Sequence, residues 1–102
     1  MKESELQKSI LQYLALKRIF HYRNNSGAFV GEYKGKSRFV QFGAVGSPDI
    51  VCVIRGRYVG IEVKAPMGKQ SQSQVNFREN LEAAGGRYIL AKSLDDVVMA
   101  IS

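Results

Sequence analysis

The 102-residue sequence carries 15 lysine and arginine residues against nine acidic ones, a formal net charge of +6 that favours a polyanionic partner. Its length and its hydrophobic content of 45% fit a single domain over residues 1–102 and exclude a mainly disordered chain. Because no apolar run is long enough for a bilayer and no signal peptide is visible, we expect no membrane partner.

The first half of the chain predicts one helix and one hairpin. Ser4 and Gln7 have capping-box spacing and open a helix over residues 4–19. A polar turn follows at residues 23–27, and residues 28–42 form a hairpin with EYKGKSR at its tip. The apolar stripe of the helix is formed by Leu6, Ile10, Leu11 and Leu14.

The second half predicts the centre of the fold. Residues 49–54 and 58–65 are rich in β-branched side chains and read as the two clearest strands. A helix over residues 71–84 and a strand over residues 87–92 follow, and Ser93 caps a short last helix. This order predicts an α/β fold with a mixed β-sheet flanked by helices.

Strand parity predicts that three charged side chains meet. Glu62 and Lys64 lie on one face of their strand, opposite a wholly apolar face. If Arg55 and Gly56 form a two-residue hairpin loop, Asp49 lies directly opposite Glu62. A loop shifted by one residue would instead place Asp49 opposite Lys64, still on the same face.

Two opposed carboxylates repel each other unless a cation lies between them. Mg²⁺ prefers oxygen ligands and takes one or two carboxylates together with water and substrate phosphate. Lys64 would then orient the attacking water or neutralise phosphate charge. The alternative is a structural ion pair between Lys64 and one of the two acids.

The motif residues resemble a known nuclease family. Pro48-Asp49 followed by Glu62, Val63 and Lys64 is similar to the PD-(D/E)xK signature. Together with GSPD, GIEVKAP and GKQSQSQVNFRENLEAAGGRYILAKS, it resembles the VRR-NUC (virus-type replication-repair nuclease) family over most of the chain. The resemblance implies a restriction-endonuclease-like fold with an αβββαβ core, Mg²⁺ or Mn²⁺ as cofactor, and cleavage of branched or flapped DNA. It also implies Asp49 and Glu62 as metal ligands and Lys64 as a catalytic residue.

The resemblance implies two further site residues. The family has an acidic residue on its first helix that reaches the metal, and Glu5 fits this position best, with Glu3 as the alternative. An acid in the first turn also stabilises the helix dipole without any catalytic role. The family's glutamine after the lysine corresponds to Gln74, which is otherwise a polar residue at the edge of the helix stripe.

Basic and aromatic residues in predicted loops are candidates for DNA contact. Tyr33 and Tyr58 are possible stacking surfaces, and Arg55 and Arg57 are further loop cations. Contacts with backbone phosphates are expected from Lys34, Lys36, Arg38 and Lys69.

We therefore expect a metal-dependent, structure-specific DNA endonuclease. Compact members of the family resemble dimeric Holliday-junction resolvases, which implies a homodimer that resolves four-way junctions. A flap or restriction-like nuclease and a catalytically inactive DNA-binding module are the alternatives. Cys52 is the only cysteine and cannot form an intrachain disulfide, so we expect a reducing cytoplasm, either bacterial or that of a phage host.

Overall fold

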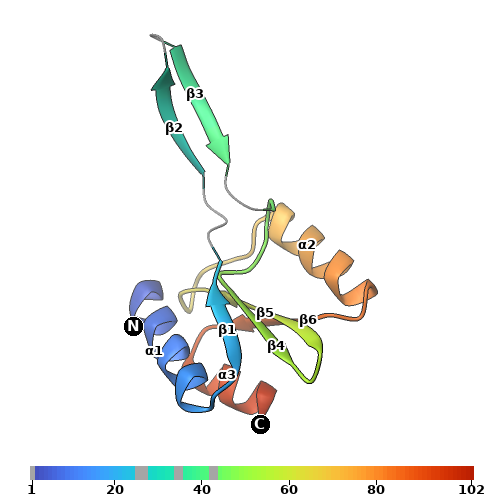
Figure 1. The fold of residues 1–102 in the computed structure, drawn as a ribbon. Helices are drawn as coiled ribbons and strands as arrows, with labels where there is room; N and C mark the ends of the chain where they lie inside the picture. Colours follow the sequence, from blue (N-terminus) through green and yellow to red (C-terminus); the bar gives the residue numbers. More distant parts are fainter. Residues whose placement is uncertain (1, 25–27, 34–35, 42–43) are drawn as a thin grey trace.

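The computed structural model describes residues 2–24, 28–33, 36–41 and 44–102, and side chains are described for 2–24 and 44–102. Three helices surround a four-stranded sheet, and a two-stranded hairpin forms a second sheet (Figure 1). None of the helices within these described ranges is long and apolar enough to cross a membrane. The elements are α1 (Glu3–Leu16), β1 (Phe20–Arg23), β2 (Ala28–Tyr33), β3 (Lys36–Gln41), β4 (Ile50–Ile54), β5 (Arg57–Val63), α2 (Gln72–Ala83), β6 (Arg87–Ala91) and α3 (Leu94–Ile101).

The main sheet has the strand order β1-β4-β5-β6. β4 pairs antiparallel with both β1 and β5, whereas β5 and β6 pair parallel, so the sheet is mixed. The β5–β6 connection contains α2, as a parallel crossover requires. The predicted α/β class with a mixed sheet flanked by helices is therefore confirmed.

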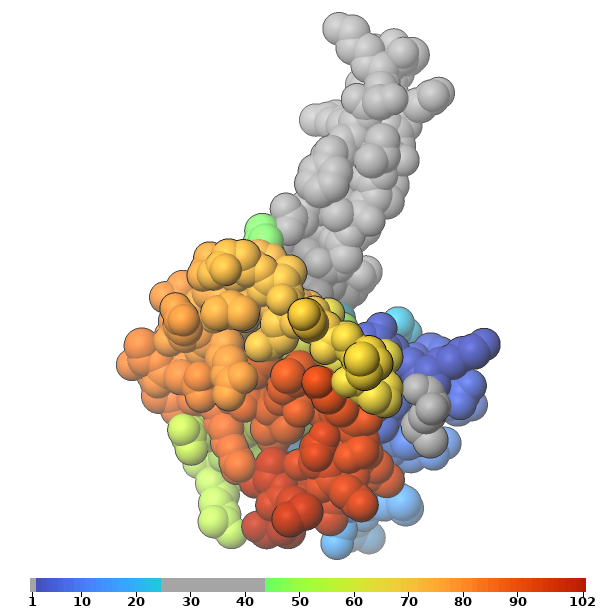
Figure 2. Space-filling model, turned by 180° about the vertical axis from the view of Figure 1, so that it is seen from behind, coloured from blue at the N-terminus to red at the C-terminus, as the bar shows by residue number. Residues whose placement is uncertain are grey.

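The helices divide between the two faces of the sheet. α1 and α3 contact each other and pack over the apolar face of the central strands. α2 packs against β6 on the other face, where the guanidinium of Arg78 lies 5.4 Å from the ring centre of Tyr88. Seen from behind, α2, β6 and α3 occupy neighbouring parts of the surface (Figure 2). The core consists of Leu6, Ile10, Leu14, Ile50, Cys52, Val59, Ile61, Val63, Ile89, Ala91 and Val97.

The predicted first helix is corrected at both ends. It begins at Glu3 after Lys2, which makes no side-chain cap, so the expected capping box of Ser4 and Gln7 does not form. The helix ends at Leu16, close to Arg18 with its φ of +57°. The residues that follow form β1, an edge strand that the sequence analysis did not predict.

The predicted hairpin is confirmed as β2 and β3, which pair antiparallel from Ala28 with Gln41 to Tyr33 with Lys36. Its tip residues lie outside the described part of the chain. In Figure 1 this hairpin extends away from the main sheet beyond the end of β1.

Candidate active site

The turn between β4 and β5 determines the register that brings the predicted acidic residues together. Arg55 and Gly56 form its two-residue loop with φ values of +53° and +77°. A type I′ hairpin turn requires positive φ at both positions. β4 and β5 pair continuously from this loop to Ile50, and one further step places Asp49 opposite Glu62. The first of the two registers expected from the sequence is therefore the observed one.

Hydrogen bonds with the backbone hold Asp49 in place. Its Oδ2 accepts a bond from the backbone nitrogen of Val63 at 2.8 Å, and its carbonyl accepts one from the nitrogen of Asn24 at 2.7 Å. The side-chain nitrogen of Asn24 donates to Ser47 Oγ at 2.8 Å and to the Pro48 carbonyl at 2.9 Å. Asn24, directly after β1, thus fixes the segment that carries the carboxylate.

Two glycines allow this segment to approach its neighbours. Gly46 has a φ of +78°, and a Cβ there would overlap the backbone of Ser73 at the start of α2. A Cβ on Gly60 would lie 2.5 Å from Cγ of Pro48. Both close approaches require residues without a side chain, so the loop before Asp49 is packed tightly between α2 and β5.

Glu62 is an acidic residue in the interior, with only 3% of its surface exposed. Tyr88 donates its hydroxyl to Glu62 Oε2 at 3.4 Å, and Gln70 donates to the Tyr88 oxygen at 2.9 Å. Burial, followed by the nearby Asp49 carboxylate, raises the pKa of Glu62 from 4.5 to about 8. Lys64 and the Tyr88 hydrogen bond act in the opposite direction but are weaker.

The donor chemistry of Asp49 and Glu62 fits a hard divalent cation. The nearby Asp49 carboxyl adds to burial in raising the pKa of Glu62 to about 8, so Glu62 retains a proton near neutral pH. A cation can replace this proton and reverse the repulsion. Within the described residues no group of three or more His, Cys, Asp or Glu side chains is arranged to hold a metal. Magnesium sites in proteins often have only one or two carboxylate ligands, with water and phosphate in the other coordination positions, so Asp49 and Glu62 are sufficient for such a site.

Lys64 and Gln74 complete the predicted cluster. Together with Asp49 and Glu62 they line one hollow of about 340 Å³. Lys64 is half-buried and close enough to the carboxylates for its charge to lower the pKa of Glu62. The structure therefore brings four of the five predicted catalytic residues to one place.

The fifth predicted catalytic residue is Glu5. The structure instead brings Glu3, the alternative on the same helix, to the site. Glu3 lines the hollow, and its Oε1 accepts a hydrogen bond from the backbone nitrogen of Ala65 at 3.0 Å. Glu5 is exposed and is not among the residues that line the hollow. Positions two apart on a helix point about 200° away from each other, so only one of them can face the sheet.

Gln74 has a structural role as well as a place at the hollow. Its Oε1 accepts a hydrogen bond from the backbone nitrogen of Ser71 at 2.8 Å, and the backbone nitrogen of Gln74 donates to Ser71 Oγ at 3.2 Å. These two bonds form the capping box of α2. With its carbonyl oxygen in the cap, Gln74 can offer only its amide nitrogen to a ligand.

The predicted DNA-contacting residues lie outside this cluster. Lys69 is exposed in the loop between β5 and α2 and does not line the hollow. Lys34 and the side chains of Lys36 and Arg38 lie outside the described part of the chain.

Several residues at the site were not predicted from the sequence to belong to it. Ser4 and Gln7 on α1 also line the hollow, while Asn24 and Tyr88 position the two acids. The spacing of Gln7 four residues after Glu3 is a signal that these two share a helix face. Asn24 and Tyr88 act through contacts distant in sequence, which no local pattern reveals.

The chain matches no protein-family model and no curated protein. The functional argument therefore rests on the geometry and chemistry of the site.

Proposed function

We propose that the protein is a metal-dependent, structure-specific DNA endonuclease that hydrolyses phosphodiester bonds. The observation that carries this proposal is the meeting of Asp49, Glu62 and Lys64 in one hollow, with the Glu62 carboxylate buried beside another acid. A structural core would be served equally well by an apolar residue at this position. A site that holds a cation against a phosphate has a use for all three charges.

Each residue has a distinct role in this proposal. Asp49 and Glu62 hold the cation, while Glu3 borders the hollow from α1. A bound Mg²⁺ or Mn²⁺ would supply activation of the phosphodiester and stabilise the developing negative charge. Lys64 orients the attacking water, and the Gln74 amide donates a hydrogen bond to the same water or to the phosphate.

The test compares metal binding and cleavage in Asp49→Asn with those in Asp95→Asn, which changes an exposed acid on α3. We expect Asp49→Asn to lose Mn²⁺ binding, measured by electron paramagnetic resonance, and to lose cleavage of a panel of duplex, flap and four-way DNA. Asp95→Asn should retain both. Full cleavage in excess EDTA would refute the metal-dependent mechanism, and metal-independent DNA binding without any cleavage would favour an inactive binding module.

The finer proposal is a homodimer that resolves four-way junctions. A junction has two-fold symmetry, and a C₂ dimer offers two matched sites from one short chain. Light scattering of the protein on junction DNA, combined with a paired-nicking assay, tests this. A monomer that cuts only flaps would favour the flap-nuclease alternative.

The basic residues in and near the hairpin are proposed to contact backbone phosphates. Replacing Lys34, Lys36 and Arg38 together should reduce the slope of log affinity against log salt by about one per lost phosphate contact. An unchanged slope would exclude them from the interface.

A further inference from the structure

One face of the sheet carries exposed aromatic side chains that do not pack into the hydrophobic core. The direct pairs of Phe20 with Val53 and of Val53 with Tyr58 place all three on the same side of the sheet. Tyr22 shares this side, because it lies two residues after Phe20. Phe20 is 67% exposed, Tyr22 51% and Val53 41%. We call these four residues the aromatic face.

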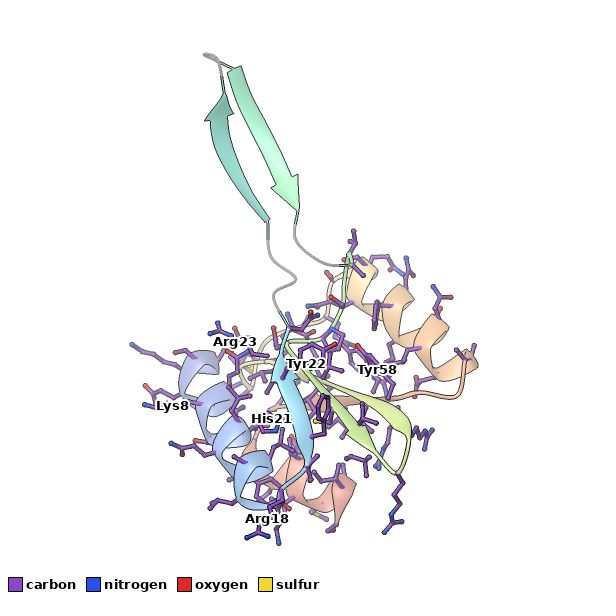
Figure 3. The ribbon with its side chains drawn as sticks, viewed as in Figure 1. Lys8, Arg18, His21, Tyr22, Arg23 and Tyr58 are labelled. Atoms are coloured by element: carbon purple, nitrogen blue, oxygen red, sulfur yellow. The ribbon has the colours of Figure 1, made fainter. Side chains whose placement is uncertain are left out.

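The two tyrosines of the aromatic face lie close to each other. Burial is the larger cause of the raised pKa of the Tyr58 hydroxyl, and the neighbouring Tyr22 hydroxyl is the second cause. In Figure 3 both side chains lie between β1 and α2, whereas Lys8 and Arg23 lie on the side of α1. The pair thus forms one aromatic surface rather than two isolated side chains.

The aromatic face and the candidate active site lie on the same side of the sheet, separated by the loop before Asp49, whose Pro48 covers Gly60. Tyr58, Gly60 and Glu62 alternate along the same side of β5. Four residues of a strand span about 13 Å, which corresponds to about four stacked nucleotides at about 3.4 Å each. A DNA strand whose phosphodiester lies at Asp49 and Glu62 would reach Tyr22 and Tyr58 by passing over the outside of the loop that carries Pro48.

The charges beside the aromatic face suit a polyanion. Arg55 and Arg57 line a hollow of about 350 Å³ together with Tyr58. The described residues contain a single ion pair, Arg78 with Glu82, so neither of these guanidinium groups is neutralised by an acid there. Arg57 donates hydrogen bonds to the carbonyls of Gly85 and Gly86, which keep its guanidinium group at the rim of the hollow.

On these grounds we propose that the aromatic face is a stacking surface for unpaired bases of a DNA strand, within about four nucleotides of the phosphodiester held at Asp49 and Glu62. The proposal rests on the nuclease function and specifies its substrate as DNA with unpaired bases beside the cut. Proteins that bind single strands combine aromatic stacking with cationic contacts to the backbone. A second copy of this chain is a poorer occupant, since a two-fold contact would bring the arginines of both copies towards one interface.

The experiment measures binding and not cleavage, in Ca²⁺ or without divalent ions. One probe is a duplex with a four-nucleotide unpaired extension that contains 2-aminopurine, and the other is the blunt duplex. Tyr22→Ala removes the exposed ring, Tyr22→Phe retains it, and Leu16→Ala is the control, because Leu16 is an exposed apolar side chain on α1.

We expect the wild-type protein and Tyr22→Phe to quench the 2-aminopurine and to prefer the extended probe. Tyr22→Ala should weaken binding of the extended probe by about 5- to 150-fold, the range for one lost base–aromatic stack, with little effect on the blunt duplex. Tyr58→Ala should act in the same direction, and Leu16→Ala should behave as wild type.

Three results would overturn the proposal: no binding of the extended probe, equal loss on both probes, or a Tyr22→Ala protein that binds as wild type. A Tyr22→Ala protein whose mass in light scattering falls from dimer to monomer would also overturn it and assign the face to a second copy. Because cleavage is not measured, this failure is distinct from failure of the nuclease function. An inactive protein that still quenches 2-aminopurine through Tyr22 would contradict only the nuclease function.

Discussion

Replacing Glu62 with glutamine should remove a loss of stability that the wild-type protein undergoes between mildly acidic and alkaline pH. The pKa of Glu62 is raised from 4.5 to about 8 in the folded state, first by burial and then by Asp49. Between these two values the folded protein retains a proton that the unfolded chain releases. The free energy of unfolding therefore falls as pH rises from about 4.5 to about 8, and the loss is complete above the folded pKa.

The size of this effect follows from the two pKa values. At about 1.4 kcal/mol per pH unit, their difference sets an upper limit of about 5 kcal/mol. For a domain of this length, 1 kcal/mol changes Tm by about 4–8 °C, so even part of this limit is easily measured. Glutamine keeps the shape of the side chain but has no charge to bury, so Glu62→Gln should escape the loss.

Urea denaturation at pH values from 5 to 9 measures the effect directly. Wild type, Glu62→Gln and Glu79→Gln are compared, because Glu79 is an exposed acid on α2 and serves as the control. Glu79→Gln should follow wild type, while Glu62→Gln should diverge from it progressively above pH 5. Adding Mg²⁺ at pH 8 should stabilise the wild type and have much less effect on Glu62→Gln. Parallel curves for all three proteins would refute the raised pKa of Glu62.

Four further substitutions test separate parts of the site. Lys64→Ala should lower the cleavage rate by several orders of magnitude with DNA affinity almost unchanged, as single-turnover kinetics and anisotropy would measure, because its charge acts mainly in the transition state; a loss of affinity alone would make it a phosphate contact. Glu3→Gln should lower cleavage while Glu5→Gln should not, since only Glu3 lines the hollow; the opposite result in the same assay would restore the family-based assignment. Gly60→Ala should cost about 1–3 kcal/mol of stability in urea denaturation, because its Cβ would press on Pro48. Wild-type stability would mean that the loop carrying Pro48 can move away from the added methyl group.

Much of the sheet and the central pair of acids could be predicted from the sequence because strand parity leaves few choices. An apolar set that must face the core fixes which side the intervening residues occupy, and a one-residue slip would bury the wrong set. The two-residue loop at Arg55 and Gly56 then selects the register that places Asp49 opposite Glu62. The apolar stripe of α1 was predicted from the helical period, and of its members Leu6, Ile10 and Leu14 are buried while Leu11 is partly buried.

The sequence was less informative where contacts are distant or where one residue changes the outcome. β1 is four residues long and lies at the edge of the sheet, and its Phe20 and Tyr22 point outwards. Neither its length nor its burial produces a clear strand pattern. Helix boundaries are equally ambiguous locally: the predicted helix began at residue 4 and left Glu3 outside it, whereas α1 begins at Glu3. The position of Lys64 beside the acids followed from strand parity. The hydrogen bonds by which Asn24 fixes the segment that carries Asp49 did not.

Departures from ordinary folding rules are concentrated on one part of the molecule. The face covered by α1 and α3 is apolar and closely packed. On the other face, Glu62 is buried beside Asp49, and Tyr22 is exposed to water. Gly46 and Gly60 accommodate close contacts with the backbone of Ser73 and the side chain of Pro48, respectively. The buried acid beside Asp49 and the exposed ring of Tyr22 are unfavourable or neutral for stability alone, and apolar residues can often replace a buried charge without loss. Because such departures are expected where a protein binds and acts on a ligand, their presence on one side of the sheet is consistent with the proposed metal site and with the proposed stacking surface beside it.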